Sequence, residues 1–195
     1  MLPSGHTLTT SVALVALWLG ASPAAPFEIQ PSLVAAKSRP RLPAMGPSYR
    51  KQVTFETGER AGTVIIQKGS KNLYFVTAPG TALRYRISVG RQGFQWTGTV
   101  SVGDKQEWPE WRPPAEMRNR QPDLPAMVPS GPYNPLGARA LYLYSDGKDT
   151  LYRIHGTNDP AGVGFDGTSG CFRLTNTDIV DLYERVKIGA RVVVE

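Results

Sequence analysis

Residues 62–77 read GTVIIQKGSKNLYFVT, and this stretch decides the fold class. Two runs rich in β-branched and aromatic residues, at 62–67 and 73–77, flank the polar, glycine-containing segment at 68–72. Such runs favour strands, and a short glycine-containing connection between them is typical of a hairpin. We therefore predict a β-hairpin here, with a largely β domain built around it.

The pattern downstream of the hairpin predicts further strands. The sequence LRYRISV at 83–89 alternates apolar and polar residues, as a half-buried strand does. Residues 95–102 continue in the same style, with glycines that favour bends or bulges. The remaining predicted strands are at 140–144, 151–154 and 190–194.

Helices are expected at two places only. Pro113 and Pro114 suit the first turn of a short helix over 115–120. Thr175 or Asn176 is a suitable cap for a helix over 177–186, whose apolar residues recur at helical spacing. The prediction is a mainly β domain with one or two short helices.

A long segment rich in proline and tryptophan connects two of these strands, from 104 to 137. Connections of this length in a compact domain are usually functional, for example as a lid or as the wall of a site. The alternative is that its tryptophans simply cover the core, and both interpretations stay open.

The N-terminal part predicts export. Residues 11–22, SVALVALWLGAS, form an uncharged apolar run that precedes small residues, so 1–25 is expected to be a signal peptide. Since no Lys or Arg precedes the run, an uncleaved anchor stays open. Residues 26–59 are expected to be a proline-rich linker with a lead-in strand, and 60–195 the folded domain. The expected location is the periplasm or cell envelope.

Composition fits a folded, basic protein. Hydrophobic residues make up 41% and charged residues 19% of 195, which is typical of a globular chain. The net charge of +6 favours anionic partners such as wall polymers or lipid head groups. Because basic and acidic residues are interleaved, nucleic acid is not expected as a partner. Membrane contact is expected only through the leader, if it is uncleaved.

The residues that predict chemistry are one histidine and the single cysteine. His155 ends a predicted strand, and Cys171 follows it by 16 residues, after a glycine-rich loop and just before the predicted helix. A thiol beside an imidazole is an acyl-transfer nucleophile with its base. Singly, each residue is more often structural. One cysteine and one histidine make a poor ligand set, so neither a metal nor a cofactor is expected.

The residues around Cys171 indicate which groups would stabilise negative charge on the substrate oxygen and on sulfur. The main-chain amides of Gly170 and Cys171 are candidates for an oxyanion hole, because glycine lets the backbone approach a substrate closely. Arg173 and the N-terminus of the predicted helix are both expected to favour a thiolate on Cys171.

Two segments carry a family resemblance. HGTN at 155–158 and TSGCFR at 168–173 resemble the signature of the YkuD-type L,D-transpeptidases, in their ErfK-like branch. The likeness extends to GPYNPLGARALY at 131–142 and WPEWRPP at 108–114, and covers roughly residues 60–195. One difference is Ser169, because many members have a histidine at this position.

The resemblance implies a YkuD-like β-sandwich that acts on peptidoglycan stem peptides. Cys171 would attack a tetrapeptide stem at the L-centre of meso-diaminopimelate, expel D-Ala, and pass the acyl group to a second stem as a 3→3 cross-link. His155 would take the thiol proton, the Gly156 carbonyl would orient its ring, and the amides of Gly170 and Cys171 would form the oxyanion hole. The implied substrate-binding residues are Arg173, Ser169, Thr168, Tyr133 and Asn134.

Other functions stay open at this point. Water as the acceptor would make an L,D-carboxypeptidase, and a protein lysine would make an enzyme that anchors proteins to peptidoglycan. A sortase fits poorly, because sortases place the histidine farther upstream and the arginine well after the cysteine. The non-enzymatic alternative is a wall-binding module with an incidental thiol.

Overall fold

The computed structural model describes residues 45–195. The predicted leader at 1–25 and the predicted linker up to residue 44 lie outside the described residues. Within 45–195, no helix combines the length and apolar character needed to cross a bilayer.

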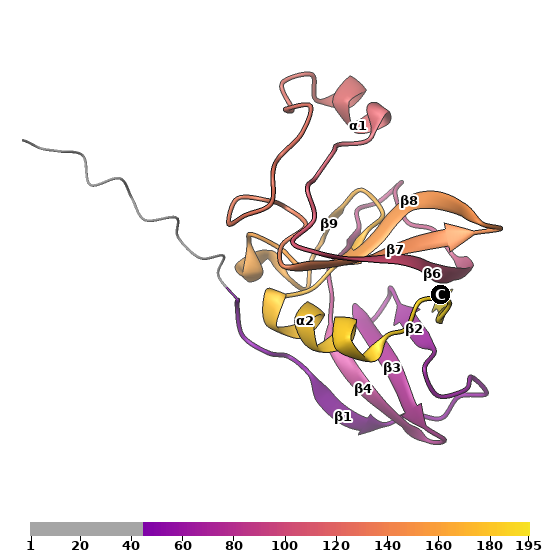
Figure 1. Ribbon diagram of the computed structural model, residues 1–195. Coiled ribbons are helices and arrows are strands. Elements are labelled where there is room, and N and C mark those ends of the chain that lie inside the picture. Colours follow the sequence, from indigo (N-terminus) through magenta and orange to yellow (C-terminus); the bar gives the residue numbers. More distant parts are fainter. Residues whose placement is uncertain (1–44) are drawn as a thin grey trace, which may run out of the picture. The chain divides into compact units, whose positions relative to one another are not determined.

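The described part of the chain is mainly β (Figure 1). Its strands are β1 (Lys51–Thr54), β2 (Val64–Gln67), β3 (Asn72–Ala78), β4 (Thr81–Arg86), β5 (Val89–Gly90), β6 (Gly98–Glu107), β7 (Arg139–Ser145), β8 (Lys148–His155), β9 (Asp166–Thr168), β10 (Phe172–Arg173) and β11 (Arg191–Val194). Its helices are α1 (Ala115–Arg120) and α2 (Asn176–Arg185), with one 3-10 turn, η1, at Pro160–Gly162.

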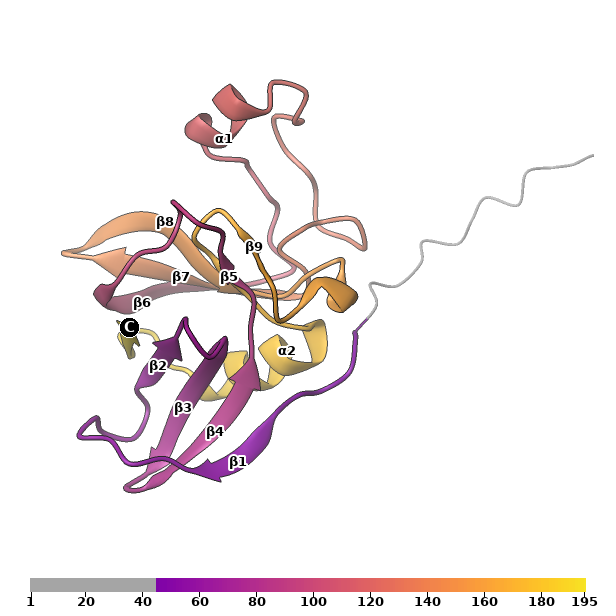
Figure 2. The same cartoon turned by 180° about the vertical axis from the view of Figure 1, so that it is seen from behind.

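Nine strands form one sheet in the order β1-β4-β3-β2-β11-β6-β7-β8-β10, and β5 pairs with β9 separately. Strand β11 joins the two halves, because it pairs parallel with β2 and antiparallel with β6. Figures 1 and 2 show β1–β4 and β6–β8 as two facing layers with α2 packed between them. The predicted mainly β sandwich with few short helices is confirmed.

The hairpins form where the sequence predicts them. Strands β2 and β3 pair antiparallel, with Val64 opposite Phe75 and both side chains buried. Strands β7 and β8 are joined by Asp146 and Gly147, whose φ angles are +49° and +75°. Two consecutive left-handed residues are typical of the tight hairpin turn that matches strand twist.

Helix α2 is capped as expected and fills the space between the layers. The Thr175 hydroxyl accepts a hydrogen bond from the Asp178 amide at 3.2 Å. Ile179 and Leu182 are fully buried in the core cluster, which also includes Phe172 and Leu174 from the preceding segment. Burial of this apolar stripe, rather than helix propensity alone, holds a ten-residue helix in place.

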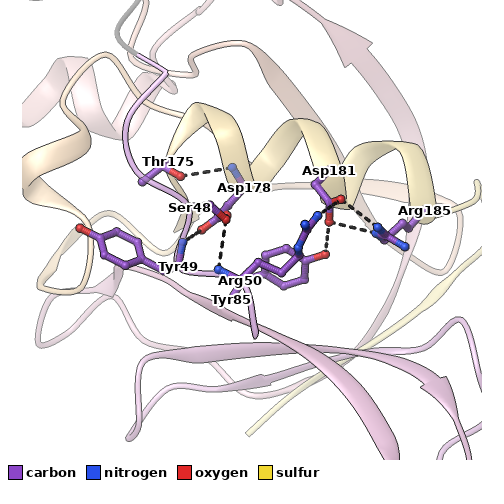
Figure 3. A network of polar contacts seen from close by, with 8 residues as sticks. All are labelled: Ser48, Tyr49, Arg50, Tyr85, Thr175, Asp178, Asp181 and Arg185. Carbon is purple, nitrogen blue, oxygen red and sulfur yellow. Dashed lines mark hydrogen bonds and ion pairs between the residues drawn. The ribbon is translucent and has the colours of Figure 1, made fainter. Parts of the chain in front are cut away.

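The segment just before β1, within the expected linker and lead-in strand at 26–59, bonds to α2. Figure 3 shows how α2 holds it. The Ser48 hydroxyl and the Tyr49 amide donate to the Asp178 carboxylate at 2.6 and 2.9 Å, and Arg50 pairs with Asp181. Proline-rich composition gave no sign of these bonds, because they depend on acids more than 125 positions downstream.

Strand β6 is longer than predicted and runs on to Glu107. Its polar second half pairs with β7, with Glu107 opposite Arg139. A register shift lies between Val102 and Asp104, and a Cβ atom at Gly103 would be 2.3 Å from the Tyr144 ring. Cross-strand pairing therefore overrides a sequence pattern typical of a loop. The long connection begins at residue 108 instead of 104.

Candidate active site

Strands β8 and β10 bring Cys171 and His155 to one edge of the large sheet. They pair in parallel, with Phe172 opposite Ile154 and Arg173 opposite His155. Phe172 and Ile154 both point into the core, where they are at most 1% exposed. Because side chains alternate along a strand, Cys171, Arg173 and His155 share the opposite face.

The His155 imidazole is held as a neutral base. Its Nδ1 lies 2.6 Å from the Gly156 carbonyl oxygen, and since a carbonyl only accepts, Nδ1 carries the proton and Nε2 the lone pair. Burial, followed by the charges of Arg173 and Arg153, lowers the pKa of His155 to about 4. Among residues 45–195 Nε2 has no hydrogen-bond partner, and the residue is 7% exposed.

The side chain of Asn176 supports the Gly156 carbonyl, a role that sequence analysis did not assign to it. Its Oδ1 accepts from the amides of Ala138 and Thr157 at 2.9 and 3.1 Å, and its Nδ2 donates to the Thr157 carbonyl at 2.7 Å. A Cβ atom on Gly156 would be 2.2 Å from this Oδ1, so only glycine fits. Asn176 therefore fixes the peptide that orients the imidazole.

Cys171 is a half-buried thiol, not the expected thiolate. Its Sγ lies 4.0 Å from the Leu151 carbonyl oxygen, and burial raises the pKa of the thiol. The predicted helix does not follow Cys171 directly, because β10 intervenes. The first amides of α2 donate to the Met45 carbonyl and to Thr175 instead. The resting pair is therefore a neutral thiol and a neutral imidazole.

The turn that carries Cys171 is fixed by Thr168 and Trp96. The Thr168 hydroxyl donates to the Cys171 carbonyl at 2.6 Å and accepts from the Gly170 amide at 3.3 Å. On the other side, Trp96 Nε1 donates to the Gly170 carbonyl at 3.0 Å, and its ring stacks on Tyr152 with centroids 4.7 Å apart. Gly170 has φ +106°, and a Cβ there would be 2.4 Å from Tyr152.

This arrangement leaves one main-chain donor, the Cys171 N–H, without an acceptor among residues 45–195. The Gly170–Cys171 peptide is trans, so the Cys171 N–H points away from the carbonyl that Trp96 holds. Within the described residues the Cys171 amide has no acceptor, whereas the Gly170 amide is engaged by Thr168. Of the two predicted oxyanion donors, Cys171 is free in the resting state. Trp96 was not predicted as a site residue.

The predicted substrate-binding residues differ in their placement. The predicted contact of Asn134 with substrate does not fit its position, because it is 1% exposed. Its Nδ2 donates to carbonyls of the long loop and its Oδ1 accepts from the Leu136 amide, so it braces the loop. Tyr133, by contrast, is 77% exposed. Arg173 donates to the Gly162 carbonyl at 2.6 Å, while its Nε is buried without a partner among residues 45–195. Ser169 is half-buried on the turn.

The long loop, 108–138, stands away from the two layers and carries α1 (Figures 1 and 2). The centre of the Phe94 ring lies 4.7 Å from the guanidinium of Arg120 in α1 and 4.5 Å from that of Arg91. The loop therefore contacts the segment that carries Trp96. Trp108 and Trp111 do not belong to the core cluster, so the expectation that they cover the core is wrong.

Comparison with known proteins agrees with this geometry. The family model of the YkuD L,D-transpeptidase catalytic domain matches residues 61–194. Probable L,D-transpeptidase YbiS of Escherichia coli K12 is 38% identical over 139 residues, covering 67% of this chain and 43% of YbiS. Probable L,D-transpeptidase ErfK/SrfK of the same strain is 37% identical over 141 residues, covering 68% and 43%. The chain spans less than half the length of these curated relatives.

Two solved structures show the same fold. The catalytic domain of an Enterococcus faecium L,D-transpeptidase acylated by ertapenem matches with a TM-score of 0.52 at 16% identity, covering 71% of this chain and all of that domain (100%). A Brucella melitensis protein described as a probable carnitine operon oxidoreductase matches with a TM-score of 0.52 at 43% identity, covering 75% and 92%.

The fold and the site together define a class of protein, a two-layered β domain in which a histidine ends one strand and a cysteine directly precedes the parallel strand beside it. Within that class the family model identifies the group. The chain belongs to the YkuD L,D-transpeptidase catalytic domain family.

Proposed function

We propose that this chain is a peptidoglycan L,D-transpeptidase that forms 3→3 cross-links through a Cys171 thioester. The observation that carries the proposal is the shared face of Cys171 and His155, with the ring held by Gly156 so that Nε2 is the basic nitrogen. The family to which the chain belongs supports the substrate class, peptidoglycan stem peptides.

In the acylation half, Cys171 Sγ attacks the carbonyl carbon at the L-centre of meso-diaminopimelate in a tetrapeptide stem. The thiol proton passes to His155 Nε2 as the C–S bond forms, and the oxyanion is held by the Cys171 N–H. Collapse breaks the C–N bond to D-Ala, and the imidazolium returns the proton to the departing amine. The products are a thioester and free D-Ala.

In the second half, an amine of another stem attacks the thioester carbonyl. His155 takes a proton from this amine and gives one back to sulfur, so the thiol is restored and a new amide is formed. Arg173, Ser169, Thr168 and Tyr133 are proposed to help position substrate, Thr168 through the turn that it braces. Export to the periplasm or envelope is part of the same proposal, since that is where stem peptides are cross-linked.

A product assay tests the proposal and its close alternatives. Full-length protein is incubated with disaccharide-tetrapeptide stems, and the products are separated and weighed by mass spectrometry. We expect a cross-linked dimer together with D-Ala, and neither from Cys171→Ala. Tripeptide without dimer would indicate the L,D-carboxypeptidase, and transfer only to a protein lysine would indicate the anchoring enzyme.

A carbapenem adduct gives a second, acceptor-independent measurement. The E. faecium relative is known in a form acylated by ertapenem, which makes this reagent a suitable probe for the thiol. We expect the mass of ertapenem to be added at Cys171 and nowhere in Cys171→Ala. A folded sample with neither adduct nor stem-peptide product would support the non-catalytic wall-binding module.

A further inference from the structure

A second concave site lies on the β1–β4–β3 part of the sheet and includes neither Cys171 nor His155. It is a cavity of about 370 Å³. Its charged lining residues are all cationic: Lys51, Lys71, Arg84 and Arg86. Ser48 and Tyr49, from the segment ahead of β1, form one wall.

The strand register places these cations close together. Lys51 on β1 is directly opposite Arg84 on β4, so their side chains are cross-strand neighbours on one face. Arg86 follows Arg84 by two residues and therefore points to that same face. Like charges directly opposite each other destabilise a sheet, so this row is unfavourable unless an anion compensates it.

Acidic partners are scarce here, unlike at other arginines. Within residues 45–195, the side chains of Lys51, Arg84 and Arg86 form no ion pair and donate no hydrogen bond, whereas Arg153 and Arg185 each pair with an aspartate. Asp166 lies 3.3 Å from Lys71, and the Asp178 carboxylate accepts hydrogen bonds from Ser48 and Tyr49 of the cavity wall. Four lining residues are cationic and none is acidic, so the lining itself is positively charged.

The cavity is also held in shape before any ligand arrives. Ser48 and Tyr49 are bonded to Asp178 of α2, as Figure 3 shows. The guanidinium of Arg86 lies 5.4 Å from the centre of the Tyr49 ring. A Cβ atom on Gly164 would be 2.1 Å from Arg86 Nε, so the backbone there packs closely against this arginine. A preformed site loses less conformational entropy on binding.

We propose that this cavity is a binding site for phosphate groups, carried by either an anionic lipid head group or a phosphodiester polymer. Guanidinium groups match phosphate oxygens in a bidentate manner, and a lysine beside them adds a point charge. A multivalent anion matches the charge of the cavity, whereas one carboxylate would leave most of it uncompensated. The site is separate from the proposed acyl transfer and does not depend on it.

The test compares two double variants with equal loss of charge. Arg84→Gln/Arg86→Gln removes the paired arginines of the cavity. Arg60→Gln/Arg118→Gln removes two exposed arginines outside the cavity that form no ion pair among the described residues. Circular dichroism and thermal unfolding establish that both variants and the wild type are folded at the temperature of the assay.

Pyrophosphate is titrated into each full-length protein by calorimetry at fixed ionic strength. We expect wild type and the Arg60/Arg118 variant to bind equally, and the cavity variant to bind at least tenfold more weakly. Three outcomes would overturn the proposal, since each shows no binding that is specific to the cavity. They are equal affinity of all three proteins, no binding by the wild type, and equal weakening in both variants. Tighter binding of a tetrapeptide stem than of pyrophosphate at the cavity would overturn the phosphate assignment.

Two further arms separate the sources of phosphate. Sedimentation with vesicles of phosphatidylcholine, with and without phosphatidylglycerol, tests the lipid head group, and binding to a soluble glycerol-phosphate polymer tests the polymer. In each arm we compare the fraction bound of the cavity variant with that of the Arg60/Arg118 variant. This comparison cancels any binding through the apolar leader, because both variants carry it. Loss confined to one arm assigns the source. Loss in neither arm contradicts the proposal.

Discussion

Replacing Trp96 with Phe tests how the turn at Cys171 is oriented. The substitution keeps an aromatic ring against Tyr152 but removes the Nε1–H that holds the Gly170 carbonyl at 3.0 Å. Without this bond the Gly170–Cys171 peptide is held only through the bonds to Thr168, and the Cys171 N–H points at the proposed oxyanion position for less of the time. The perturbation acts on orientation and leaves the thiol and imidazole in place.

The size of the effect is bounded by the bond itself. One such hydrogen bond is worth about 0.5–1.5 kcal/mol net, so the productive orientation becomes roughly two- to tenfold less populated. Complete loss of an oxyanion donor costs about 10²–10³ in rate, which sets a ceiling that this variant does not reach. We therefore expect acylation to slow by roughly two- to tenfold, with the affinity for the unreacted reagent nearly unchanged.

Single-turnover acylation by ertapenem, followed by stopped-flow absorbance, separates the rate from the binding step. A matched control is Thr77→Val on β3, which removes the side-chain bond to the Thr81 carbonyl of β4 at 3.2 Å and should leave the rate unchanged. An unaltered acylation rate in a folded Trp96→Phe protein would refute the orientation argument. Absence of acylation in the wild type would instead refute the proposed function.

Three other outcomes follow from the structure. Since neutral His155 is the proposed base and its pKa is lowered to about 4, acylation should fall only as pH drops through about 4; a limb near pH 6.5 in the pH–rate profile would contradict this. Asn176→Ala leaves the buried amides of Ala138 and Thr157 without their acceptor. The free energy of unfolding, measured with urea, should fall by about 1–3 kcal/mol, and an unchanged value would show that these bonds are dispensable. Partial burial raises the pKa of Asp181, but hydrogen bonds from Arg185 and Tyr85 lower it more and hold this pKa below its usual range. Asp181 therefore stabilises the fold above the ordinary carboxyl pKa and loses this effect as pH falls through its folded value, so the stability gap between wild type and Asp181→Asn should close in acid.

The fold and the central pair were predictable because their signals are local. Alternation, turn residues and capping residues lie within a few positions of the strand or helix that they predict. His155, Gly170 and Cys171 also lie in one short stretch of the sequence. The extent of β6 was not predictable, because its polar end is a strand only through pairing with β7. Trp96 was missed for a similar reason: it meets Gly170 across 74 positions, and no pattern near either residue marks that contact.

Asn134 shows the opposite failure, in which a motif position was given the wrong role. Motif membership indicates that a residue matters but does not say which way its side chain points. Here the amide is buried among the carbonyls of the loop that it braces, so its importance is structural. The expected thiolate failed in a related way, since sequence distance between Cys171 and the helix hid the two-residue strand β10 between them.

The neutral resting pair changes how the arginines of the site should be understood. A preformed thiolate and imidazolium would place a positive ring beside Arg173 and Arg153, both of which lower the pKa of His155. The same positive charges favour negative charge that develops nearby, and in acyl transfer that charge appears on the substrate oxygen. At Cys171 itself the charge of Arg153 also favours the thiolate, but it does not offset the burial that raises the pKa of the thiol. In the proposed acyl transfer, stabilisation that acts only as the proton moves to Nε2 and the C–S bond forms raises the rate.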